Sequence, residues 1–138
     1  MNKKIFIASD HAGYEMKTAL KDHFSSFIDL GTNSIDSVDY PDFAHKLTNE
    51  VLNNDESLGI LICGTGVGMS IAANRSEGIR AGLVNSIEVA RLIRQHNDAN
   101  VLVIPGRFMD NEEAKNCVKV FIDTQFEAGR HQKRVEKI

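Results

Sequence analysis

The stretch from residue 59 to residue 68, GILICGTGVG, constrains the fold more than any other part of the chain. Gly59 to Ile62 has the pattern of a buried strand that ends on Cys63, and three alternating glycines then lead into a helix of small residues. Alternating glycines let successive backbone N–H groups point into one concavity, to which the following helix adds its positive N-terminal end. The turn therefore predicts a site for an oxyanion or a phosphate, beside a thiol whose thiolate the same field favours.

Strand-like and helix-like segments alternate along the chain. Apolar, β-branched runs predict strands over residues 4–8, 27–30, 59–62, 78–84 and 101–105. Helix-start signals predict helices after Ser9 or Asp10, near Pro41, after Gly68, at Ser86 and at the capping box Asp110–Glu113. This order indicates an α/β fold of three layers: a Rossmann-like, five-stranded parallel sheet with helices on both faces, followed by a C-terminal helical tail.

In such a fold, ligands bind beyond the carboxyl ends of the strands. Polar or glycine-rich residues follow four of the predicted strands, namely Asp10 and His11, residues 63–68, Asn85, and Gly106 with Arg107. These residues are therefore expected at one edge of the sheet. They are the first candidates for a binding site.

Length and composition predict one domain over residues 1–138. The chain is 42% hydrophobic and 25% charged, with a formal net charge of -3. No charge excess favours a nucleic-acid or membrane partner, so a small-molecule ligand is expected. Two cysteines in strand-like and helix-like segments favour a reducing cytoplasm over a disulfide framework. The short apolar run near the start predicts neither a signal peptide nor a membrane span.

The glycine turn has other readings. A dinucleotide fingerprint that starts at Gly64 would need its third glycine at position 69, which is Met69, and no P-loop lysine follows. A tight turn without a ligand is the simplest alternative. Cys63 by itself would more often be a small buried hydrophobe than a reactive thiol. Its place at the mouth of the turn favours the reactive reading.

Histidines and acids supply candidates for proton transfer. His96 ends a predicted helix next to Asn97, at the edge of the expected crevice, so it is either an acid–base group or a histidine that interacts with the last helix carbonyls. Asp10 and His11 lie at a strand-to-helix turn, where Asp10 can also serve as a cap. The chain has no H-x-x-x-H or C-x-x-C spacing, so no metal site is predicted.

Three arginines are candidates for binding an anionic group, because a guanidinium binds phosphate in a bidentate manner. Arg107 follows the last predicted strand, and Arg130 and Arg134 lie one helical turn apart in the basic tail, residues 126–138. The alternative is a solvated basic tail. Two arginines one turn apart in an otherwise acidic chain favour a phosphate grip.

Several motifs are similar to those of a known family. They are SDHAG at 9–13, DYPD at 39–42, ICGTGVGMSIAAN at 62–74, GIRA at 78–81, RQHNDANVL at 94–102 and GRHQKRV at 129–135. In one register from Ile5 to the C-terminus, the chain resembles the type B ribose-5-phosphate isomerases. That family also contains galactose-6-phosphate and allose-6-phosphate isomerases.

The resemblance implies a role for each matching residue. Cys63 matches the base that moves a proton between C2 and C1 of the sugar, and His96 matches the residue that helps to open the furanose ring. The positions that match substrate-binding groups are Asp10, His11, Tyr40, Gly64, Thr65, Gly66, Val67, Gly68, Asn97, Arg107, Arg130, His131 and Arg134. Some members carry a carboxylate a few residues after the turn in place of the cysteine, and MSIAA here resembles the cysteine branch.

The resemblance also implies a homodimer or a tetramer of dimers with the site between subunits, no metal or cofactor, and a place in pentose phosphate metabolism. The expected reaction interconverts ribose 5-phosphate and ribulose 5-phosphate through a cis-enediolate, which needs a base, an oxyanion site, an acid and a phosphate grip. The alternatives are an isomerase of a six-carbon sugar phosphate and a non-catalytic sugar-phosphate-binding subunit.

Overall fold

The computed structural model describes residues 3–138, so the first two residues of the expected domain lie outside the description. The strands are β1 (Ile5–Ser9), β2 (Ile28–Asp29), β3 (Leu58–Cys63), β4 (Ala81–Leu83) and β5 (Val101–Pro105). The helices are α1 (Tyr14–His23), α2 (Tyr40–Asn53), α3 (Val67–Ala73), α4 (Ile87–Gln95), α5 (Asn111–Asp123), the 3-10 turn η1 (Gly129–His131) and α6 (Gln132–Val135).

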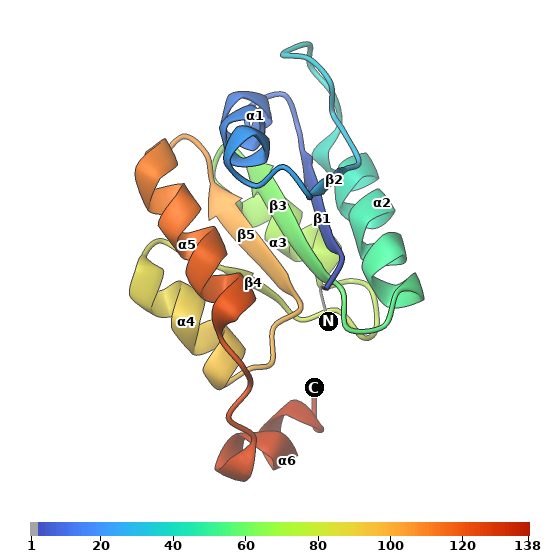
Figure 1. The fold of residues 1–138 in the computed structure, drawn as a ribbon. Helices are drawn as coiled ribbons and strands as arrows, with labels where there is room; N and C mark the ends of the chain where they lie inside the picture. The colour runs from blue at the N-terminus through green and yellow to red at the C-terminus, as the bar shows by residue number, and fades with distance from the viewer. Residues whose placement is uncertain (1–2) are drawn as a thin grey trace.

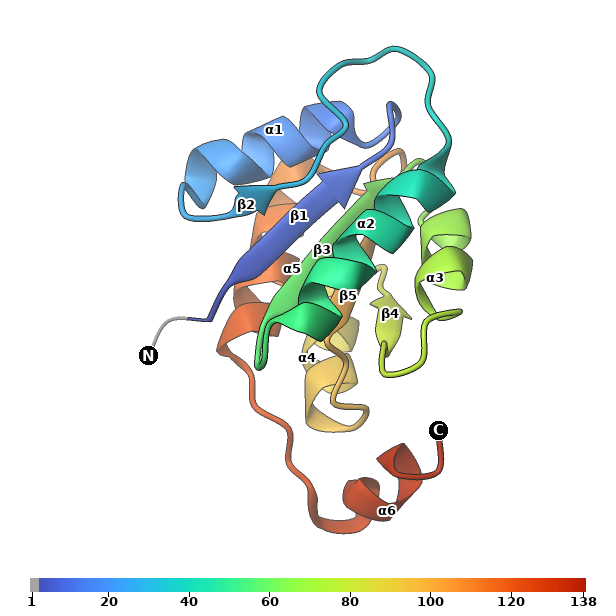
Figure 2. The same cartoon turned by 90° about the vertical axis from the view of Figure 1, so that its right-hand side faces the viewer.

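The five strands form one parallel sheet in the order β2-β1-β3-β5-β4. Helices α1, α4 and α5 cover one face and α2 and α3 the other, so the three-layer α/β fold is confirmed (Figures 1 and 2). The central strand β3 is buried along its whole length. None of the helices in residues 3–138 is long and apolar enough to cross a membrane.

Three local expectations need correction. The spacing of α2 predicts Ala44, Leu47, Val51 and Leu52 on its inner face, but Leu52 is 44% exposed because it lies about 100° round the helix from Val51. Neither Ser9 nor Asp10 caps α1, whose N-cap is Gly13. Asp10 instead accepts a hydrogen bond from the Gly13 N–H at 3.1 Å, inside the turn. β4 covers only part of residues 78–84.

A buried ionic network joins α1 to the segment after β2. Lys17 is 1% exposed, and its Nζ donates to Asp29 Oδ1 at 2.6 Å and to the carbonyl of Thr32. Lys21 binds the second carboxylate oxygen of Asp29 at 2.9 Å, and the Gly31 N–H donates to the first. The network therefore holds the start of the connection between β2 and α2, which borders the carboxyl edge of the sheet.

The network predicts an acid-sensitive contribution to stability. Burial alone would raise the pKa of Asp29, but bonds from Lys17, Gly31 and Lys21 outweigh it and lower this pKa below its ordinary value of 3.8. A carboxylate whose pKa is lowered on folding stabilises the protein at pH values above its ordinary pKa. This stabilisation is lost as the pH falls through the folded-state pKa. We expect Asp29→Asn to lower the free energy of unfolding by about 3 kcal/mol at pH 7, because Lys17 stays buried and unpaired.

The measurement is urea unfolding of the wild type and Asp29→Asn at pH 7 and below pH 4. The difference in unfolding free energy between the two proteins should narrow as the pH falls from 3.8 through the lower folded-state pKa of Asp29, because the wild-type carboxylate takes up a proton over that range. Asp123→Asn is the matched control, because Asp123 makes an exposed ion pair with Lys119. A gap of the same size at both pH values would contradict the assignment.

Candidate active site

Cys63 ends β3 and opens onto a cavity at the carboxyl edge of the sheet. The thiol residue is 5% exposed, and the cavity has a volume of about 430 Å³. Its lining consists of Asp10, His11, Ala12, Tyr40, Cys63, Gly64, Thr65, Val67, Gly68, Ile71 and Arg107. The structure thus brings together the candidates that follow β1, β3 and β5, as the parallel topology predicts.

The glycine turn after Cys63 has a conformation that few other residues allow. Gly66, the N-cap of α3, has a φ of 78°, in the left-handed region, and a Cβ there would overlap Leu83 Cδ1. The carbonyls of Cys63 and Gly64 accept hydrogen bonds from the N–H groups of Gly106 and Arg107, at 2.8 and 2.9 Å. The turn is therefore tied to the end of β5, which fixes it beside the thiol.

Arg107 and Tyr40 pack directly on this turn. A Cβ on Gly64 would lie 3.1 Å from Arg107 Nη1, so the guanidinium lies against the glycine backbone. A Cβ on Gly68 would lie 2.5 Å from ring carbons of Tyr40, which forms a wall of the cavity. Glycines thus admit both side chains. Arg107 shares the cavity of Cys63, as its place after β5 predicts, and is not grouped with the two tail arginines.

His11 is oriented by the connection that leads into α2. Its Nδ1 accepts a hydrogen bond from the Val38 N–H at 3.1 Å. With Nδ1 occupied as an acceptor, a neutral ring carries its proton on Nε2, which is then a donor. The neighbouring Asp10 is 6% exposed and borders the same cavity.

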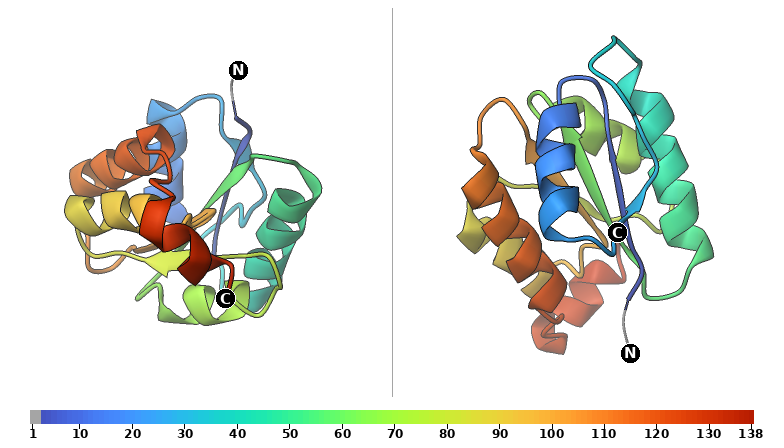
Figure 3. Two further views of the ribbon diagram at one scale, coloured as in Figure 1. Left: turned by 90° about the horizontal axis from the view of Figure 1, so that it is seen from below. Right: turned by 45° about the horizontal axis from the view of Figure 1, so that its top comes forward.

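The remaining candidates lie at the opposite edge of the sheet. His96 caps the carboxyl end of α4, and the N–H of Gly59, near the start of β3, donates to the carbonyl of Asn100 at 2.9 Å. Residues 96–100 therefore lie where the strands begin, and the C-terminal tail lies below the same edge (Figures 1 and 3). This tail group comprises His96, Asn97, Arg130, His131 and Arg134, and none of these residues lines the Cys63 cavity.

The expectation that His96 borders the crevice of Cys63 is wrong for the two residues of the same chain, because His96 lies at the opposite edge of the sheet. A helix that returns between two parallel strands runs against them, so its carboxyl end lies at the edge where the next strand starts. β3 has six residues, which at roughly 3.3 Å each put about 17 Å between its ends. Cys63 and the tail group therefore belong to two separate surfaces of the chain.

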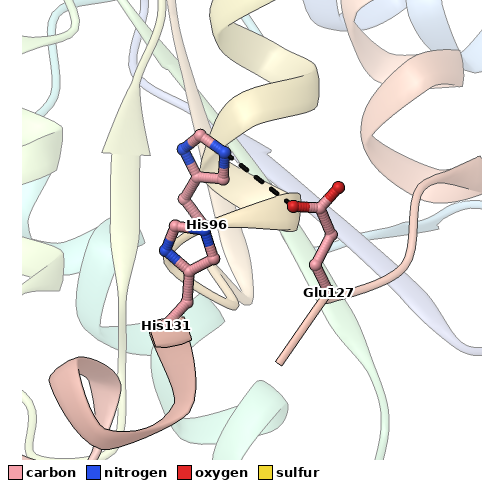
Figure 4. A group of neighbouring side chains, drawn as sticks. All are labelled: His96, Glu127 and His131. Atoms are coloured by element: carbon pink, nitrogen blue, oxygen red, sulfur yellow. Dashed lines mark ion pairs between the residues drawn. The ribbon is translucent and has the colours of Figure 1, made fainter. Parts of the chain in front are cut away.

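The tail is attached to α4 by a stack of two imidazoles. The rings of His96 and His131 lie 4.3 Å apart between centroids and 15° from parallel, and the Glu127 N–H donates to the carbonyl of Gln95 at 3.1 Å. Glu127 Oε1 lies 4.0 Å from His96 Nε2 (Figure 4). Burial, followed by the charges of His96, Arg130 and Arg134, lowers the pKa of His131. Sequence reasoning missed Glu127.

These three side chains are also the group that most resembles metal ligands among residues 3–138. Their donor atoms lie within 4.8 Å of one another. Zinc bonds of about 2.1 Å in a tetrahedral shell would place donors about 3.4 Å apart. The stacked rings also direct their lone pairs along parallel planes rather than toward one point. Metal binding would therefore require both rings to turn.

Comparisons with known proteins agree on one family. The family model described as Ribose/Galactose Isomerase matches residues 5–138. A probable ribose-5-phosphate isomerase B of Mycoplasma pneumoniae is 50% identical over 100% of this chain and 94% of its own length. A crystal structure of a ribose 5-phosphate isomerase from Thermotoga maritima superposes with a TM-score of 0.94, at 49% identity over 99% of this chain and 97% of that one.

A second solved structure contains a ligand. It is the ribose-5-phosphate isomerase B of Mycoplasma genitalium with bound ribulose-5-phosphate, with a TM-score of 0.94 and 46% identity over 99% of this chain and 94% of that chain. The resemblance that the sequence motifs suggested is confirmed over the whole described fold. The chain therefore belongs to the ribose/galactose isomerase family.

Proposed function

We propose that this protein is an aldose–ketose isomerase that interconverts ribose 5-phosphate and ribulose 5-phosphate. One observation carries the proposal: Cys63 opens onto a cavity that is also lined by the glycine turn, Asp10 and His11. The relatives named for this reaction support the choice of substrate, including the one solved with ribulose-5-phosphate. It is proposed to act in the cytoplasm, in pentose phosphate metabolism, and its two free, buried cysteines fit a reducing compartment.

The proposed chemistry assigns the proton transfer to Cys63. Its thiolate removes the proton from C2 of the open-chain aldose and leaves a cis-enediolate, whose negative oxygen is held by the backbone around residues 64–68. The protonated thiol then returns the proton to C1 while the hydroxyl proton of O2 passes to O1, which gives the ketose. No redox partner is needed, because the oxidation of C2 is matched by the reduction of C1. His96 opens the furanose ring before this step.

Two copies of the chain are needed to assemble this site. Cys63 and the tail group lie about 17 Å or more apart along the sheet, which is longer than a five-carbon sugar phosphate. We therefore propose a homodimer, alone or within a tetramer, in which His96, Asn97, Arg130, His131 and Arg134 of one subunit complete the Cys63 cavity of the other. The arginines would bind the phosphate, while Arg107 approaches the substrate from the subunit of Cys63.

A substrate panel tests the proposal. Turnover should be highest on ribose 5-phosphate and much lower on allose 6-phosphate and galactose 6-phosphate. An alkylating agent should abolish turnover, because it reacts with the Cys63 thiolate, and a chelator should leave it unchanged. Higher turnover on a six-carbon substrate would contradict ribose 5-phosphate as the substrate and support the alternative, an isomerase of a six-carbon sugar phosphate. Loss of activity with chelator would contradict a metal-free reaction.

Binding of these sugar phosphates without turnover would favour the non-catalytic alternative. Isothermal titration with ribose 5-phosphate separates the two cases, since it detects binding whether or not the sugar reacts. If bound ribose 5-phosphate slows the alkylation of Cys63, the sugar occupies the thiol cavity.

A further inference from the structure

Glu127 is an acidic residue within a basic tail, and its position next to His96 is not explained by stability. Its side chain is 52% exposed and lies 4.0 Å from His96 Nε2, and exposed ion pairs contribute little to folding. Its backbone N–H is bonded to the carbonyl of Gln95, so the main chain holds the carboxylate near the end of α4. Figure 4 shows the Glu127 carboxylate on the Nε2 side of the His96 ring, with the other ring nitrogen, Nδ1, on the opposite side.

One face of the His96 ring is also occupied. His131, 8% exposed, stacks on it with a centroid separation of 4.3 Å. Burial and nearby positive charges lower the pKa of His131, which disfavours a second positive charge beside His96. His96 is therefore held by a ring on one face and by a carboxylate at one edge, which leaves Nδ1 as the atom free to exchange a proton.

We propose that Glu127 is a positioning residue for ring opening: its carboxylate accepts the Nε2–H of His96 and directs Nδ1 at the sugar. This inference rests on the proposed function and deepens it. The 4.0 Å separation closes with a small rotation of the exposed Glu127 side chain, as bonds of this kind often tighten only with substrate bound. His96 then relays a proton between O4 and O1 of the furanose, so the C1–O4 bond breaks, the C1 carbonyl forms and no proton is gained or lost.

The two sugars of the reaction separate this role from a structural one. Ribose 5-phosphate exists mainly as a ring closed between O4 and C1, and must be opened. Ribulose 5-phosphate has its carbonyl on C2, and the oxygen that would close a five-membered ring carries the phosphate, so the ketose is already open. A residue that acts only in ring opening affects the first sugar and spares proton abstraction from the second.

The experiment compares wild type, Glu127→Ala and the matched control Glu136→Ala. Glu136 is an exposed carboxylate in the same tail and accepts a hydrogen bond from Gln132. For Glu127→Ala, kcat on ribose 5-phosphate should fall about tenfold at unchanged KM. This loss is smaller than the roughly 10²–10⁴-fold contribution of a general acid–base group, because His96 itself is still present. Solvent deuterium incorporation at C1 of ribulose 5-phosphate should stay within about twofold of wild type. Glu136→Ala should match wild type in both. Equal losses with both sugars, or no loss with ribose 5-phosphate, would overturn the proposal.

A second measurement isolates ring opening. In a Cys63→Ala background, where isomerisation stops, the enzyme should still speed the exchange of the two ribose 5-phosphate anomers, measured by NMR magnetisation transfer. Adding Glu127→Ala should slow that exchange about tenfold, and adding Glu136→Ala should not. Equal exchange rates in all three proteins would refute the role of Glu127. Wild-type protein inactive on both pentose phosphates would instead refute the proposed function.

Discussion

Replacing Cys63 by alanine is expected to lower kcat on ribose 5-phosphate by about 10²–10⁴-fold, the usual contribution of a positioned acid–base group. In the proposed mechanism the Cys63 sulfur accepts the C2 proton, and the glycine turn that borders the same cavity would hold the negative oxygen. The fold should persist, because alanine keeps the Cβ of this strand end. The measurements are coupled turnover, thermal unfolding, and titration with ribose 5-phosphate, which should still bind.

The second cysteine provides the control. Cys117 is fully buried in α5, with its Sγ 4.0 Å from Met109 Sδ. Burial, with a smaller contribution from Glu113, raises the pKa of its thiol to about 11, so it is neither a base nor a target for alkylation at neutral pH. Cys117→Ala should keep wild-type turnover with some loss of stability. Normal turnover in Cys63→Ala would refute the assignment of the base.

Two inactive variants are expected to restore activity when they are combined. Cys63→Ala damages only the cavity at the carboxyl edge, and the double variant Arg130→Ala/Arg134→Ala damages only the tail group at the opposite edge. If each site draws on both subunits, a mixed dimer contains one intact site and one with both defects. Random reassembly of equal amounts should give about a quarter of wild-type activity, because half of the dimers are mixed and each has one working site.

The variants should be mixed in mild denaturant and returned to buffer, so that subunits exchange before turnover is measured. A mixture of Cys63→Ala with a variant carrying both sets of substitutions has no intact site in any combination, and should stay inactive. Size-exclusion chromatography of each protein reports the assembly present. If the first mixture also stayed inactive while its subunits exchanged, each chain would have to hold a complete site by itself, in conflict with the separation along β3.

Local patterns were sufficient for the elements and for the thiol site. β5 covers residues 101–105 as the apolar run predicts, Pro41 lies in the first turn of α2, and the Asp110 carboxylate accepts the Glu113 N–H at the start of α5. Parallel strands end at a common edge, so the sequence alone groups Asp10, Cys63 and Arg107. The element boundaries depend on residue spacing within single elements, and the common edge depends on the shared direction of the parallel strands.

The sequence by itself determined the fold class, the glycine turn and the strand ends that meet at the Cys63 cavity, since these follow from residue spacing and from the order of strands and helices along the chain. Only the tertiary structure decided that His96 lies at the far edge, that Arg107 is separated from Arg130 and Arg134, and that Glu127 faces His96. The physical reason is that α4 runs against the strands and carries its last residues away from Cys63, while the irregular tail after α5 folds back on that end through His131. Neither the position of the end of α4 nor the packing of the tail on it can be predicted from residue periodicity.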